Sequence, residues 1–345
     1  VIREWFSKNL RKITYNGQSV ESLLLPQMKA DFYHFEGNTQ ALRLVTKLHY
    51  LVDEHGMNLT KGLLGTIIKY PVSSLEINSK SGNIKDKKMG YYYAERDIFR
   101  DLQESLGVCG ARHPLSYVLE AADDIAYLTA DIEDAFKKGC ITFGQLVQEL
   151  DKCGSGEAEN GEYFRMAKAL EERFEKAVAR EIAQPENHAV QNWIVRVQAK
   201  LIACATDGFA GHYQEIMDGK YTAELLKGTE GERLAWALGD IAYRYAFISK
   251  PILKLEIAAE TILNFLLEKF TDAVIYYDTG KEMNAVQEKM MALISDNYKA
   301  IYRIYSKGKD ETERLYLRLL LVTDFICGMT DSYAKGLYQE LNGMG

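Results

Sequence analysis

The sequence has little proline and no cysteine framework. Five prolines in 345 residues leave room for long helices, because proline breaks a helix interior. The five cysteines are odd in number, scattered along the chain and without a Cys-x-x-Cys pair. Such cysteines are typical of reduced thiols and speak against a disulfide scaffold or a zinc site. We therefore expect a cytoplasmic protein that is rich in α-helix.

Positive net charge and long apolar runs are also absent. The formal net charge is −7, so the molecule as a whole attracts neither nucleic acid nor an anionic membrane. No apolar run is long enough to span a bilayer, and we expect no signal peptide. Any site for phosphate must therefore be a local cluster of Lys or Arg, and we expect no membrane partner.

A starting methionine is missing as well. The first residues, Val1-Ile-Arg-Glu-Trp-Phe6, have the pattern of the interior of an amphipathic helix, without a capping residue. We expect the sequence to be a fragment, or to lack an upstream part.

What the chain does contain is helical periodicity over most of its length. One short exception, Lys12 to Val20, alternates around Asn16-Gly17 and predicts a small β-hairpin. Polar stretches at 78–90 and 152–162 predict loops. We predict an all-α multi-helix bundle, with residues 1–150 as a core region and 151–345 as a helical extension packed on it. The predicted helices are 1–10, 38–55, 59–69, 95–106, 114–138, 164–181, 186–206, 231–246, 252–273, 284–305 and 311–342.

The helix predicted after Pro114 has two distinct faces. At about 100° per residue, Asp123, Tyr127, Asp131 and Asp134 share one face. The opposite, core-facing side should hold Val118, Ala121, Ile125, Leu128, Ile132, Ala135 and Phe136. A solvated acidic face explains the aspartates equally well. The tyrosine between two aspartates, four residues from each, favours the wall of a binding site.

Five blocks of the sequence, taken in order, resemble bacterial dGTP triphosphohydrolases of the HD-domain superfamily. The resemblance covers nearly the whole chain. The blocks are Phe35-Glu-Gly-Asn-Thr-Gln40 with Arg43; Lys69-Tyr70-Pro71; Lys87-Lys-Met-Gly-Tyr91 with Glu95; Glu120-Ala-Ala-Asp-Asp-Ile-Ala-Tyr127 with Asp131-Ile-Glu-Asp134; and Gly328-Met-Thr-Asp331 with Tyr333-Ala334.

The resemblance implies an HD-type bundle with a divalent metal site, for Mg²⁺ or Mn²⁺, in which Asp123 is the last of four protein ligands. The other three ligands would be a His and an adjacent His-Asp pair. The sequence has six histidines but no His-Asp dipeptide. We expect these ligands, and the catalytic His and Glu, upstream of Val1, so that this chain holds no catalytic residue and is inactive alone. The alternative is a relative that has lost catalysis.

The resemblance also implies substrate-binding residues. Tyr127 would pack on the deoxyribose and Asp131 would accept a hydrogen bond from its 3′-hydroxyl. The phosphates would be bound by Asn38, Lys69, Tyr70 and Lys88, and guanine by Glu256. Each residue also has a plainer explanation. Tyr127 could be a half-buried packing residue, Asn38 a helix cap, Lys69 a structural or solvated lysine at the end of a helix, and Glu256 a solvated helix residue.

We therefore expect an enzyme that hydrolyses dGTP, alone or together with other dNTPs, to the deoxynucleoside and inorganic triphosphate. Two alternatives stay open: a non-catalytic nucleotide-binding or oligomer-scaffold protein, and a phosphodiesterase or nucleotidase of the HD superfamily. The resemblance further implies a homo-oligomer, often a hexamer, and in some members activation by nucleotides or single-stranded DNA. The net charge gives no support for binding to single-stranded DNA.

Overall fold

The computed structural model describes residues 1–50, 53–153 and 162–344, which fold into two compact units. The first unit combines Val1–His113 with Ile257–Gly345, and the second is Pro114–Glu256. The division predicted at residue 150 falls inside α8 (Phe143–Cys153). One boundary between the units coincides with the start of α7 (Pro114–Lys137), and the other lies within α13 (Lys250–Val274).

The prediction of an all-α fold is confirmed. Within the described residues the only strands are β1 (Thr14–Tyr15) and β2 (Gln18–Ser19), an antiparallel pair. Their turn uses Asn16 and Gly17, both at positive φ, as a tight two-residue hairpin requires. In the described part of the chain, no helix has the length and apolar character needed to cross a membrane.

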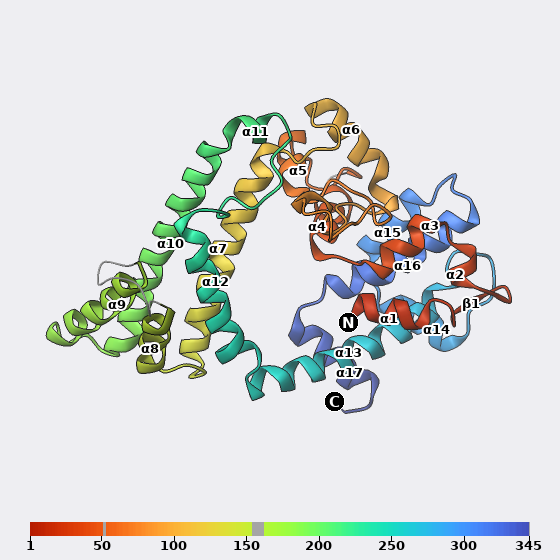
Figure 1. Cartoon of the computed structure of the whole chain (residues 1–345). Coiled ribbons are helices and arrows are strands. Elements are labelled where there is room, and N and C mark those ends of the chain that lie inside the picture. Colours follow the sequence, from red (N-terminus) through yellow and green to blue (C-terminus); the bar gives the residue numbers. More distant parts are fainter. Residues whose placement is uncertain (51–52, 154–161, 345) are drawn as a thin grey trace. The chain divides into compact units, whose positions relative to one another are not determined.

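The first unit contains helices from both ends of the chain (Figure 1). Its most buried element is α16 (Glu311–Cys327), in which every residue from Leu315 to Ile326 is buried. Aromatic and aliphatic side chains from distant segments, such as Phe6, Phe32 and Phe270, share its core. The other helices of this unit are α1 (Ile2–Asn9), α2 (Val20–Leu23), α3 (Pro26–Tyr33), α4 (Gly37–Arg43), α5 (Lys61–Ile67), α6 (Arg96–Leu106), α14 (Ala285–Leu293), α15 (Asp296–Tyr305) and α17 (Asp331–Leu341).

The second unit is built around α7, which packs against α10 (Pro185–Gly211) and α12 (Glu230–Ala242) (Figure 1). The predicted core face of α7 is largely confirmed, because Ala121, Ile125, Ile132 and Ala135 are buried. Val118 was wrongly assigned to that face and is 43% exposed. The remaining helices are α8, α9 (Glu162–Ala179) and α11 (Tyr213–Met217).

Three predicted helices are shorter than expected. The helix predicted over 38–55 comprises α4 and a π-helical turn, Leu44–Leu48, and the chain then folds back so that Met57 donates a backbone hydrogen bond to Val45. Residues 51–52 and 154–161, which include most of the predicted loop 152–162, lie outside the described residues. The helix predicted over 284–305 is divided between α14 and α15, because Ile294 and Ser295 have extended backbones.

The helix predicted over 311–342, the third that is shorter than expected, is divided into α16 and α17 at Gly328. A Cβ at Gly328 would lie 2.1 Å from the Tyr298 hydroxyl, so the tyrosine leaves no room for a side chain there. Thr330 then caps α17, accepting a hydrogen bond from the amide of Tyr333 at 3.2 Å. Capping thus starts a new helix where the apolar period alone predicted a continuous one.

Candidate functional site

The first unit brings together three of the sequence blocks that carried the resemblance. The Thr39 hydroxyl, in the first turn of α4, donates to the Met89 carbonyl at 2.9 Å. The amide of Gly90 donates to the Val72 carbonyl at 3.0 Å. A Cβ at Gly90 would lie only 1.8 Å from the carbonyl oxygen of Tyr70, so this close approach requires glycine. The blocks that hold Asn38, Tyr70 and Lys88 are therefore neighbours in space.

Asn38 and Lys88 meet at one carboxylate, that of Glu36. The Lys88 ammonium lies 3.2 Å from Glu36 Oε1 and 3.1 Å from Oε2, and Asn38 Nδ2 donates to Oε1 at 3.1 Å. Asn38 is the second residue of α4, and the N-cap position is occupied by Glu36. The explanation of Asn38 as a helix cap is therefore wrong. Two nitrogen donors from residues predicted to bind phosphate therefore converge on one carboxylate.

Lys69 and Tyr70 are buried, at 7% and 5% exposure. Lys69 lies beyond α5, whose last helical residue is Ile67. The explanation of Lys69 as a solvated lysine is therefore wrong. A structural role for this buried lysine stays open.

The second unit places Asp123, Tyr127 and Asp131 on one face of α7, as predicted. Asp123 is exposed, Tyr127 is 61% exposed, and Asp131 is half-buried. The Tyr127 ring lies 6.4 Å from the ring of Phe247, between centroids. Partial burial raises the pKa of Asp131, and the neighbouring charge of Asp134 adds to this rise. Burial likewise raises the pKa of Tyr127, with a further contribution from Asp131. Within the second unit, the polar groups of Asp123, Tyr127 and Asp131 therefore lie largely at the surface.

Glu256 is the last residue of the second unit and lies near the start of α13. Its side chain is exposed, as are those of Leu255 and Ile257 beside it. Nothing in this setting distinguishes a residue that contacts guanine from a solvated helix residue.

The described residues do not form a complete metal site. None of them belongs to a group of three or more His, Cys, Asp and Glu side chains that could hold a metal ion. Asp123 can supply one carboxylate group as a ligand, whereas Mg²⁺ and Mn²⁺ require several oxygen or nitrogen ligands. The described residues therefore fit such an ion only as the source of one ligand.

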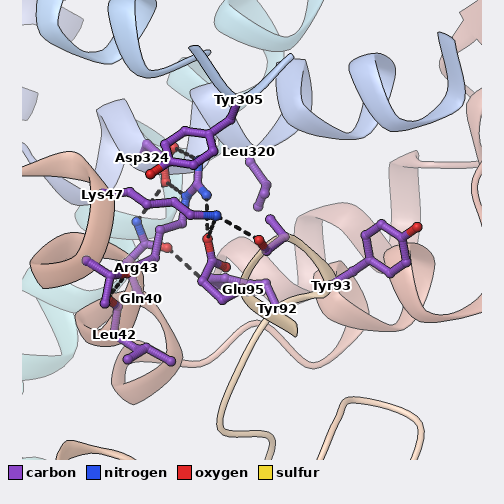
Figure 2. Close-up of polar contacts among 12 residues, drawn as sticks. Gln40, Leu42, Arg43, Lys47, Tyr92, Tyr93, Glu95, Tyr305, Leu320 and Asp324 are labelled. Carbon is purple, nitrogen blue, oxygen red and sulfur yellow. Dashed lines mark hydrogen bonds and ion pairs between the residues drawn. The ribbon is translucent and has the colours of Figure 1, made fainter. Parts of the chain in front are cut away.

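A buried network of charged side chains connects α4 and the turn that follows it to Glu95 and to α16 (Figure 2). Arg43 Nε and Nη2 donate to the two oxygens of Asp324 in α16, at 2.8 and 2.7 Å. Arg43 Nη1 contacts Glu95 at 2.8 Å, and the Lys47 ammonium contacts the same oxygen at 2.9 Å. Gln40 joins the network by donating to Asp324 at 2.9 Å. These contacts fix α4, which follows Glu36 and contains Asn38, one of the residues predicted to bind phosphate.

The charges of the network stabilise one another. Burial alone would raise the pKa of Glu95, but Lys47 and Arg43 outweigh it, so the pKa lies below its ordinary value. Burial alone would lower the pKa of Arg43, but Asp324 and Glu95 outweigh it and raise the pKa. At Lys47 burial dominates and the pKa is lowered, although Glu95 opposes this. All three side chains are buried, so each needs its charged partners to offset the free-energy cost of losing contact with water.

Several residues of this region had no role in the sequence analysis. Glu36 and Arg43 stood inside quoted blocks without an assigned role. A charged residue between Phe35 and Gly37 gives no local sign that it pairs with Lys88. For Arg43 a weak signal existed in the sequence, because this charged residue interrupts the alternation of polar and apolar positions expected of a surface helix. In the structure Arg43 is buried, together with Leu42 and Thr46.

Comparison with known proteins identifies the family. The chain is 46% identical, over 346 residues, to a Listeria monocytogenes protein named deoxyguanosinetriphosphate triphosphohydrolase-like protein, and this match covers 99% of the chain and 72% of the relative. The chain belongs to the deoxyguanosinetriphosphate triphosphohydrolase family. The predicted resemblance to this family is thereby confirmed.

More distant members of the deoxyguanosinetriphosphate triphosphohydrolase family match over similar lengths. A Pseudomonas aeruginosa protein named probable deoxyguanosinetriphosphate triphosphohydrolase is 28% identical, over 99% of the chain and 73% of the relative. The deoxyguanosinetriphosphate triphosphohydrolase of Serratia proteamaculans is 28% identical, over 95% of the chain and 67% of the relative. No protein-family model matches the chain.

Proposed function

We propose that this protein hydrolyses dGTP, in preference to other dNTPs, to deoxyguanosine and inorganic triphosphate. In this reaction water attacks the α-phosphorus, the bond from that phosphorus to the 5′-oxygen breaks, and the 5′-oxygen takes up a proton. The observation that carries the proposal is the convergence of Asn38 and Lys88 on one carboxylate, beside the segment of Lys69 and Tyr70. The names of the relatives support the same substrate.

The residues of this chain would bind and orient the substrate. Lys88 and Lys69 would offset the charge of the phosphates, with Asn38 and Tyr70 as neutral partners. Tyr127 would pack under the deoxyribose, where a 2′-hydroxyl would meet the ring. Asp131 would accept the hydrogen bond from the 3′-hydroxyl. Glu256 would accept hydrogen bonds from the N1–H and the 2-amino group of guanine.

Asp123 would contribute one ligand to a divalent ion, Mg²⁺ or Mn²⁺, whose chemistry when bound is to polarise the α-phosphoryl group. The other ligands would come from outside the described residues. Metal dependence is tested by adding EDTA and then restoring Mn²⁺ or Mg²⁺, and Asp123→Asn should require more metal for the same rate. A rate that EDTA leaves unchanged would contradict this role.

The test of the reaction itself is product analysis. The protein is incubated with dGTP and Mn²⁺, and the phosphorus-containing products are separated by ion-exchange chromatography. Inorganic triphosphate with deoxyguanosine supports the proposal. Pyrophosphate or orthophosphate as the first product would contradict it and favour a phosphodiesterase or nucleotidase.

A second function is favoured by the incomplete metal set. The 345-residue chain by itself would bind nucleotide without hydrolysing it, because the described residues supply a single candidate ligand. Equilibrium binding of dGTP without product formation would support this. Homo-oligomerisation also stays a prediction. Light scattering tests it, because an oligomer of this chain should have a molar mass that is a multiple of 39.2 kDa.

A further inference from the structure

The hairpin of α9 and α10, in the second unit, contains a cavity of about 290 Å³ that is lined mainly by basic residues. α9 contributes Arg173 and Lys176, which lie on one helical face because they are three residues apart, and Arg180 follows directly after the end of α9 at Ala179. α10 contributes His188, Asn192 and Arg196, each four residues from the next. The two faces meet at the cavity, whose lining includes the buried Ala177 and the half-buried Ile182.

The charge of this cavity is strongly one-sided. Its lining includes four permanently charged basic side chains and one acid, Glu172. Within the described part of the chain, none of these four cations has a carboxylate within ion-pair distance. Arg173 makes a backbone contact, with Nη1 donating to the Ala169 carbonyl at 3.1 Å. Elsewhere on a protein of net charge −7, basic side chains are commonly paired, as Lys200 is with Glu230 and Arg244 with Glu149.

Unpaired cations that face one another repel, and this arrangement is favourable when an anion lies between them. Guanidinium groups match the geometry of phosphate oxygens, and an ammonium adds a point charge. His188 and Asn192 add groups that can hydrogen-bond to oxygen. An excess of about three positive charges corresponds to the charge of an oligophosphate rather than of a single phosphate. Apart from the His188 imidazole, the lining contains no aromatic ring on which a nucleobase could stack.

We propose that this cavity binds an oligophosphate, either inorganic or as the phosphate tail of a nucleoside triphosphate, and does not read the base. The site is separate from Asn38, Lys69, Tyr70 and Lys88, which belong to the other unit. It does not depend on whether the protein hydrolyses dGTP.

The test is calorimetric titration of the full chain with inorganic triphosphate and, in separate arms, with ATP and GTP. The double variant Arg180→Gln/Arg196→Gln removes two guanidinium groups from the cavity. Its matched control, Arg165→Gln/Lys168→Gln, removes two exposed charges from α9 outside the cavity. The cavity variant should bind triphosphate about tenfold more weakly or worse. The control should change affinity by less than about threefold, since exposed charges act weakly at a distance. Melting curves should show both variants folded, because the replaced side chains are exposed.

The arms also identify the source of the phosphate. Equal loss for triphosphate, ATP and GTP supports recognition of the phosphates alone. An affinity that differs strongly between ATP and GTP would overturn the claim that the base is not read. Equal weakening in both double variants would overturn the site in favour of a general charge effect.

Binding at the proposed substrate site is separated from binding at the cavity by Lys88→Gln. A binding event that is lost in Lys88→Gln and kept in the cavity variant belongs to the proposed substrate site. If this is the only binding event observed, the cavity proposal is overturned. Binding of a single-stranded oligonucleotide without any binding of triphosphate would also overturn it. The two sites can therefore fail independently.

Discussion

The Lys88 ammonium and the Glu36 carboxylate form an ion pair, with nitrogen–oxygen distances of 3.2 and 3.1 Å. The pair joins the turn before α4 to a segment 52 residues later in the chain. Asn38 donates to the same carboxylate. Glu36 therefore holds two donors in the positions that the proposed function assigns to the phosphate end of dGTP.

From this pair we predict that Glu36→Gln lowers the KM for dGTP. The substrate no longer competes with a carboxylate for Lys88, and a negative charge near the phosphates is removed. Since exposed ion pairs contribute up to about 1 kcal/mol, KM should fall by roughly fivefold. The control is Glu104→Gln, which removes the same charge from an exposed position in α6. A rise in KM would mean that Glu36 helps to form the site.

We predict that Tyr127→Ala weakens discrimination against ribonucleotides. Without the ring, a 2′-hydroxyl meets no obstacle, so the ratio of kcat/KM for dGTP to that for GTP should fall by about tenfold or more. Steady-state assays with both nucleotides measure this ratio. Tyr127→Phe keeps the ring and should keep the ratio. If GTP is rejected equally well by Tyr127→Ala, Tyr127 has no role at the sugar.

We predict that Asp324→Asn destabilises the first unit by about 3 kcal/mol, because it leaves Arg43 partly unpaired in a buried setting. Urea denaturation measures the free energy of unfolding. Arg43→Met/Asp324→Leu should cost less than the sum of the two single changes, since neither charge is then left without its partner. The exposed pair Lys61 and Asp101 is the control, where Lys61→Met should cost at most about 1 kcal/mol.

Asp31 predicts a specific pH dependence of stability. Burial raises its pKa from 3.8 to about 7, against hydrogen bonds from Ser74, Tyr316 and Tyr93. The folded state therefore binds a proton that the unfolded state releases, and stability contributed by Asp31 is present below about pH 4 and lost as pH rises to about 7. The loss amounts to about 4 kcal/mol, at roughly 1.4 kcal/mol per unit.

The measurement is the difference in unfolding free energy between the wild type and Asp31→Asn, taken across this pH window. The variant cannot ionise at this position, so the difference isolates Asp31 from other carboxyl groups. A difference that stays constant from pH 4 to 7 would show that Asp31 is ionised in the folded protein throughout.

We predict that Gly90→Ala displaces the segment of Tyr70. The new methyl group would lie 1.8 Å from the Tyr70 carbonyl oxygen, and backbone must move to admit it. The cost should be about 1–3 kcal/mol in unfolding free energy, with a higher KM for dGTP. Gly62→Ala is the control, because its Cβ meets nothing within 4 Å and alanine favours the helix α5. Unchanged stability in Gly90→Ala would contradict this packing.

Local patterns in the sequence were sufficient for several features of this protein. The Asn16-Gly17 hairpin follows from the positive φ angles that these two residues adopt readily. The face of α7 that carries Asp123, Tyr127 and Asp131 follows from helical geometry alone. The order of the quoted blocks was enough to indicate the family.

Helix ends were less predictable where long-range packing decides them. The apolar period continues through Gly328, yet α16 ends at Cys327 and Thr330 caps a new helix, while Tyr298 from another helix leaves no room for a side chain at Gly328. The period also continues beyond Leu48, where the returning chain at Gly56 and Met57 packs on Val45. Such contacts leave no mark on the segment that they interrupt.

The sequence by itself thus determined the helical class, the hairpin, the polar face of α7 and the membership of the family, because each depends on residues close together in the chain or on the order of motifs. Only the tertiary structure decided that Glu36 faces Lys88, that Gly90 lies against Tyr70, and that Arg43 pairs with Asp324 across 281 residues. Arg43 and Asp324 pair because packing excludes water from both charged groups, which then require partners that only the folded chain can supply. The other two contacts depend on which distant segments pack side by side.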